Sequence, residues 1–250
     1  MASTDHNNQF ANQAEGAIKR MGLEGYTPYK VKPLNLPERI ESAEVAEIIN
    51  ASIAEGNDPA ADPEVQHVIA RRGIMEYTGW IRTQQENDES VLRVQMVKKQ
   101  APALIEEMKA KFEAATDELR EAYKVLGAER LWDEKASWPP HDPKWPTRVK
   151  ARAAIYTTDT IISNWSYLMQ TIYGQIGINA GVRVFAIPTA ANYEIHRNEL
   201  ASGKRSDWST TGVYDMLIMG VEVDLATTYA EVHERVQTLD AVLNARRELR

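Results

Sequence analysis

A segment between residues 189 and 213 carries the side chains best suited to chemistry in this chain. His196 and Glu194 are the acid–base candidates, because a positioned imidazole or carboxyl group can exchange a proton with a substrate. Acidic and basic residues balance in the segment, which disfavours a polyanion site. The segment is longer than a hairpin turn requires, so it either contacts a ligand or partner or is a surface loop held by Trp208. The candidate contact residues are Tyr193, Glu194, His196, Arg197, Arg205 and Trp208.

A basic patch beside Trp145 is a second candidate. Cations next to an aromatic residue can contact the phosphates of a nucleic acid, although the solvated beginning of a helix is the favoured interpretation. The acidic residues of the stretch 38–64 could instead meet this patch, within one subunit or between subunits. The patch consists of Lys144, Arg148, Lys150 and Arg152.

Motifs for metal, nucleotide or serine chemistry are incomplete. His233 begins the two-histidine zinc pattern, but Gln237 stands where the second histidine is needed. Gly203-Lys204 lacks the earlier glycine of a phosphate loop, because position 198 is asparagine. The chain has no cysteine and no Gly-x-Ser-x-Gly sequence, which excludes thiolate sites and a serine nucleophile elbow. The sequence therefore predicts no metal site and no cofactor.

The element with the clearest pattern is a helix from Pro102 to Leu126. Its apolar residues recur at alternating steps of three and four, which is the spacing of a coiled-coil seam. Charged residues fill the outer positions, so the stripe must be buried against another helix of the same chain or of a second copy. The stripe consists of Ile105, Met108, Phe112, Ala115, Leu119, Ala122 and Leu126.

The remaining elements predict a predominantly helical α+β protein. Residues 1–127 form a helical region with an acidic helix and the heptad helix, 128–146 a connector rich in Trp and Pro, and 147–250 a helix–strand–strand–helix unit. The two strands are predicted at Val182–Ile187 and Tyr214–Val223, where apolar and polar residues alternate. Residues 90–98 fit a strand or a helix, and a continuous helical region is favoured. Asp62-Pro63 is typical of a helix cap followed by proline at the first helical position.

Composition and charge favour a protein partner. The net charge of −7 disfavours nucleic acid as the main partner, and no run of residues has the length of a membrane span. The start of the chain lacks the pattern of a signal peptide, so a cytoplasmic location, or one within a viral particle, is expected. The favoured function is a non-enzymatic assembly or protein-interaction protein of bacterial or viral type that self-associates through a helical face. The alternatives are an enzyme with a site at residues 189–213, with His196 and Glu194, and a less favoured nucleic-acid accessory protein.

Overall fold

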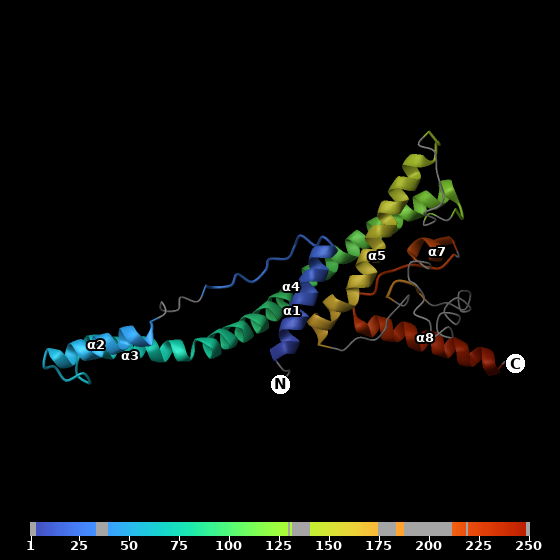
Figure 1. Ribbon diagram of the computed structural model, residues 1–250. Helices are drawn as coiled ribbons and strands as arrows, with labels where there is room; N and C mark the ends of the chain where they lie inside the picture. Colours follow the sequence, from blue (N-terminus) through green and yellow to red (C-terminus); the bar gives the residue numbers. More distant parts are fainter. Residues whose placement is uncertain are drawn as a thin grey trace. The chain divides into compact units, whose positions relative to one another are not determined.

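The computed structural model describes residues 4–33, 40–129, 131, 141–174, 184–187, 212–218 and 220–248. The regular secondary structure within these ranges is helical (Figure 1). The chain forms two compact units: unit 1 comprises Met1–Asn8 and Tyr29–Arg93, and unit 2 comprises Gln9–Pro28 and Val94–Arg250. The helices are α1 (Thr4–Arg20), α2 (Ser42–Ala54), α3 (Pro63–Glu76), α4 (Thr78–Leu126), α5 (Trp145–Tyr173), α7 (Val213–Ile218) and α8 (Tyr229–Glu248).

In unit 1, α2 lies alongside α3, and Asp62 fixes the connection between them (Figure 1). The Asp62 carboxylate accepts a hydrogen bond of 2.6 Å from the Ser52 hydroxyl and one of 2.9 Å from the Glu64 backbone N–H. These hydrogen bonds, the one from Ser52 first, lower the pKa of Asp62. Asp62 is thus the N-cap of α3 with Pro63 directly after it, which confirms the predicted cap.

Unit 2 is organised around the apolar stripe of α4. Met108, Phe112, Ala115, Leu119, Ala122 and Leu126 are all buried, and Ile105 is partly buried. They belong to a core cluster with residues of α1 such as Ile18 and residues of α5 such as Leu168. The prediction that the stripe is buried is therefore confirmed, and helices of the same chain cover it.

Helix α4 is continuous through the stretch that the sequence left ambiguous. Residues 90–98 are helical, and Pro102 lies inside the same helix, so the continuous helical interpretation is confirmed. The helix predicted after the connector and the final helix correspond to α5 and α8. In both cases the apolar spacing located the helix within a few residues of its observed ends.

The predicted strand at Tyr214–Val223 is wrong. Residues Val213–Ile218 form the short helix α7, and Gly220 follows it with a φ of +71°. The Val221 N–H donates to the Met216 carbonyl at 2.8 Å and the Gly220 N–H to the Leu217 carbonyl at 3.0 Å, the hydrogen bonds of a glycine-terminated helix end. Apolar residues of a helix, a turn and an extended segment alternated along the chain by coincidence.

The other predicted strand, Val182–Ile187, is described only from Val184 to Ile187. Ala186 and Val223 form an isolated antiparallel bridge, and the Ala226 N–H donates to the Val184 carbonyl at 2.7 Å. No strand or sheet occurs in the described ranges, so the helix–strand–strand–helix unit and the α+β class are wrong for this part of the chain. Residues 184–187 and 222–226 share three backbone hydrogen bonds, and side chains of neighbouring helices donate to further carbonyls of these segments.

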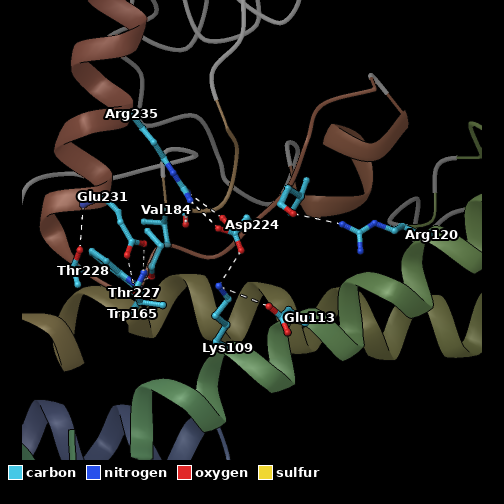
Figure 2. Close-up of polar contacts among 12 residues, drawn as sticks. Lys109, Glu113, Arg120, Trp165, Val184, Asp224, Thr227, Thr228, Glu231 and Arg235 are labelled. Atoms are coloured by element: carbon cyan, nitrogen blue, oxygen red, sulfur yellow. Dashed lines mark hydrogen bonds and ion pairs between the residues drawn. The ribbon is translucent and has the colours of Figure 1, made fainter. Parts of the chain in front are cut away.

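The extended residues 221–228, which we call the strap, are held by side chains from three helices (Figure 2). The Trp165 indole N–H of α5 donates to the Ala226 carbonyl at 2.7 Å. Arg235 of α8 donates to the carbonyls of Val184 and Asp224, each at 3.0 Å. Lys109 of α4 forms an ion pair of 3.4 Å with the Asp224 carboxylate. The Trp165 and Arg235 contacts supply donors to backbone carbonyls of the strap, those of Ala226 and Asp224.

Helix α8 begins directly after the strap with a cap of its own. The Glu231 N–H donates to the Thr228 hydroxyl at 3.2 Å, and the Glu231 carboxylate accepts hydrogen bonds of 2.7 Å from the Thr227 N–H and hydroxyl (Figure 2). This arrangement resembles a capping box and fixes the point at which the strap becomes helix.

Candidate functional site

Unit 1 carries an open groove of about 320 Å³ beside Trp80, which we call the Trp80 groove. One wall is the first part of α4 and the other is the extended segment that contains Tyr29 and Lys32. The Gln85 side-chain amide links the two walls by donating to the Lys32 carbonyl at 2.8 Å. It also donates to Glu89 of the same helix at 2.6 Å. The lining includes Tyr29, Lys32, Trp80, Gln84, Asp88 and Leu92.

Large apolar side chains are exposed near the junction of α3 and α4. Tyr77, the C-cap of α3, and Trp80, in the first turn of α4, are each 64% exposed. Ile69 and Ile74 of α3 are also exposed. Exposed apolar side chains that form a patch mark interaction surfaces. We call the Trp80 groove together with Tyr77 the groove face.

The core beneath this surface is small. Among the described residues of unit 1, the buried apolar side chains are Ile40, Val65 and Val68. Unit 1 therefore exposes more large apolar side chains than it buries, whereas unit 2 has an extended core. An additional chain that covered the groove face would remove this apolar surface from water.

The stretch of sequence that includes the α4 wall of the groove is acidic. Residues 40–93 contain eleven acidic and four basic residues, a net charge of −7 that equals the net charge of the whole chain. No lysine or arginine occurs between residues 40 and 70. Asp88 is exposed at the groove. An exposed indole next to carboxylates can hold a cation, through the ring face and the negative charge together.

The predicted basic patch is largely neutralised in the structure. Arg148 is only 7% exposed, and its guanidinium forms ion pairs of 3.0 Å with Glu129 and 2.6 Å with Asp142. Lys144 pairs with Glu129 at 2.8 Å. The hydrogen bond from Lys144 lowers the pKa of Glu129, and the hydrogen bond from Arg148 lowers the pKa of Asp142. These two cations fix the beginning of α5 against residues that precede it in the chain.

The other two residues of the patch remain at the surface of α5. Lys150 and Arg152 are exposed, and the Arg152 Nε donates to the Leu131 carbonyl at 2.9 Å. The four predicted residues therefore divide into Lys144 and Arg148, which pair with carboxylates, and Lys150 and Arg152, whose side chains are exposed.

The predicted contact residues Tyr193, Glu194, His196, Arg197, Arg205 and Trp208 lie outside the described residues. Of the segment 189–213 that contains them, the structure describes Gly212 and Val213, and α7 begins at Val213. The Asp159 carboxylate of α5 lies next to Gly212, since a Cβ at this position would be 3.4 Å from the Asp159 Oδ1. No sequence signal pointed to Asp159, because nothing local distinguishes an aspartate on the buried side of a helix from one on its exposed side.

Asp159 is a partly buried carboxyl group in the middle of α5. Burial raises its pKa to about 6, and no hydrogen bond or ion pair to its carboxylate is found among the described residues. A carboxyl group with such a pKa can exchange protons near neutral pH. Acid–base catalysis also needs a positioned substrate or a second polar group, and the described residues supply neither beside Asp159.

We expect Asp159→Asn to stabilise the protein at about pH 7.5 by roughly 1–2 kcal/mol, a figure reduced from the full pKa shift because solvent partly screens the group. The folded state binds the proton more tightly than the unfolded state, so the stability of the wild type falls as pH rises from 3.8 toward about 6. The amide cannot ionise and avoids this loss. Urea unfolding of both proteins at about pH 4 and pH 7.5 measures the difference in their free energies of unfolding.

The exposed carboxylate Glu118 provides the control, since Glu118→Gln should leave the pH dependence of stability unchanged. An equal stability difference between Asp159→Asn and wild type at both pH values would show that the carboxyl group is not perturbed.

Metal and membrane sites were also sought in the described ranges. No three His, Asp or Glu side chains there lie close enough together to ligate one metal ion. None of the described helices combines the length and apolar composition that a bilayer crossing requires.

The groove face was missed by sequence reasoning, although part of its signal is local. Tyr77 and Trp80 are two aromatic residues three positions apart in a stretch that also contains Ile74, Met75 and Ile81, and a sequence of this kind fits either a buried core or an exposed binding surface. Only the folded unit shows that they are exposed. Comparison of the chain with protein-family models, with curated proteins and with solved structures found no match.

Proposed function

We propose that this protein is a non-enzymatic interaction protein that self-associates, and that the groove face of unit 1 is a contact surface for that association. The observation that carries the proposal is Trp80, which is 64% exposed and lines an open groove, with the equally exposed Tyr77 three residues before it in the sequence. Tryptophan and tyrosine in such positions dominate the energetics of protein interfaces.

The structure changes which helical face is available for association. The heptad stripe of α4 is covered by helices of its own chain, so it has no need of a second copy. The exposed apolar side chains of unit 1 are still uncovered in the single chain. Self-association through a helical face is therefore assigned to α4 near Trp80 rather than to the stripe at 105–126.

The alternatives receive less support from the described residues. Two of the four cations of the basic patch are neutralised by Glu129 and Asp142, which leaves a small electrostatic footprint for nucleic acid. An enzyme with His196 and Glu194 has one described feature in its favour, the raised pKa of Asp159 beside Gly212, without a described partner group.

We expect Trp80→Ala to weaken self-association by about thirtyfold, which corresponds to the roughly 2 kcal/mol expected of an interface hot spot. Trp80 is mostly exposed in the single chain, so the substitution should leave the fold intact. Sedimentation velocity over a wide range of concentration measures the association, and circular dichroism checks the helix content.

Tyr167→Ala is the matched control, because Tyr167 is also an exposed aromatic residue but belongs to unit 2. It should associate as the wild type does. A wild-type chain that remains monomeric at every concentration would refute self-association.

A further inference from the structure

The Trp80 groove is lined by charged side chains of both signs. Lys32 belongs to the extended wall, and Asp88 and Glu89 belong to the wall formed by α4. Glu89 already accepts a hydrogen bond from Gln85. Lys32 and Asp88 are exposed, and within the described part of the chain no ion pair or ring contact joins either side chain to another residue. One groove therefore offers both a cation and an anion to a partner.

The α4 wall of the groove is a regular row of side chains. Trp80, Gln84, Asp88 and Leu92 all line the groove, and they follow one another at intervals of four residues, which places them along one ridge of the helix. Ridges of this spacing interdigitate when two helices pack across each other. All four side chains are exposed, so the row is accessible to a helix from outside the chain.

The groove is complementary to a second copy of itself, because it contains both members of an ion pair. When two copies meet through the same surface about a two-fold axis, each contact occurs twice with the roles exchanged. Lys32 of each copy can then meet Asp88 of the other. The Trp80 ring lines the same groove, so the incoming ammonium group can also gain a cation–π interaction. Gln84 offers a donor and an acceptor, and its carboxamide can therefore pair with its own copy.

We propose that two copies of this chain associate groove to groove about a two-fold axis, with Lys32 of each copy paired with Asp88 of the other. This inference rests on the proposed function, since it names the partner of the groove face as the same face of a second copy. Such a contact occupies the surface on both copies, so the assembly closes at the dimer. Residues 40–93 carry a net charge of −7, and salt at about 0.15 M screens the resulting repulsion beyond roughly 8 Å, a distance longer than an ion pair.

Charge reversal at the two positions tests the pairing. Lys32→Glu alone and Asp88→Lys alone each turn two attractive contacts into two repulsive ones, and each should raise the dissociation constant of the dimer at least about tenfold. An equimolar mixture of the two variants should associate within about threefold of the wild type, because the mixed dimer regains both pairs. Sedimentation velocity with one variant fluorescently labelled measures the mixture, at the salt concentration that screens the long-range repulsion.

Lys30→Glu and Glu86→Lys are the matched controls. Both residues are exposed in unit 1, and neither is among the residues that line the groove. These variants change the net charge of the chain by the same amounts as Lys32→Glu and Asp88→Lys do. Each should change the dissociation constant by less than about threefold, and their mixture measures how much of any effect comes from net charge. Circular dichroism checks that every variant keeps its helix content.

The outcomes separate this inference from the proposed function. If the wild type associates but the groove variants and the control variants behave alike, the two-fold pairing is overturned and self-association still stands. A mixture of Lys32→Glu and Asp88→Lys that associates no better than either variant alone, or a wild type that assembles beyond the dimer, also overturns the pairing. A wild type that is monomeric at all concentrations refutes the proposed function itself.

Discussion

Replacing Phe112 by alanine is expected to lower the free energy of unfolding by about 3–5 kcal/mol, the range measured for deletion of large side chains from packed cores. Phe112 is 1% exposed and lies in the middle of the buried stripe of α4. The substitution removes the transfer free energy of the ring and leaves a cavity, because close-packed neighbours relax only partly. Urea unfolding followed by circular dichroism gives the value.

Val125→Ala on the same helix is the control for this measurement. Val125 is 52% exposed, so its truncation should change the free energy of unfolding by less than about 0.5 kcal/mol. A loss below about 1 kcal/mol for Phe112→Ala would be incompatible with a packed stripe.

Trp165→Ala is expected to produce a comparable loss of about 3–5 kcal/mol. Trp165 is fully buried in α5, its ring meets that of Tyr229 edge to face at 5.1 Å, and its indole N–H donates to the Ala226 carbonyl. Truncation would remove the core contact of α5 and also the donor that holds the strap. Thermal and urea unfolding should therefore both report a strongly destabilised protein.

Trp165→Phe separates the two contributions. Phenylalanine keeps an aromatic ring in the core but leaves the Ala226 carbonyl without its donor, which should cost about 1–3 kcal/mol. Hydrogen exchange should rise at the amide of Ala226, which donates to the Val184 carbonyl. If Trp165→Phe proved as destabilising as Trp165→Ala, the loss common to both variants, that of the indole donor to the Ala226 carbonyl, would outweigh the packing of the ring.

The long helices were predictable because their signal is local and repeated. Every turn of the 105–126 stripe supplies an apolar residue at the same angle, so Phe112 and Leu119 indicate one buried face whatever covers it. Asp62-Pro63 carries its information in adjacent residues, since a capping carboxylate and a proline at the first helical position act within one turn. Such features can be recognised from the sequence alone.

The C-terminal region was mispredicted because its conformation depends on contacts between distant residues. The strap is fixed by Trp165, 61 residues before Ala226, and its Val223 carbonyl accepts a 3.5 Å hydrogen bond from Arg120, 103 residues away. The alternation from Leu217 to Val223 fits a strand equally well when these partners are unknown. Side chains of α4, α5 and α8 donate to carbonyls of the strap, where a regular sheet would have a continuous row of backbone hydrogen bonds from a neighbouring strand.

The candidate surfaces, too, were predictable from the sequence only in part. The sequence by itself determined the acidic block at 38–64, the basic cluster at 144–152 and the aromatic residues near Trp80, since composition is independent of folding. Only the tertiary structure decided which charges are used internally, as Arg148 is by Glu129 and Asp142, and which reach the surface. Burial is a property of the assembled chain, because a side chain loses water only when segments remote in sequence pack over it.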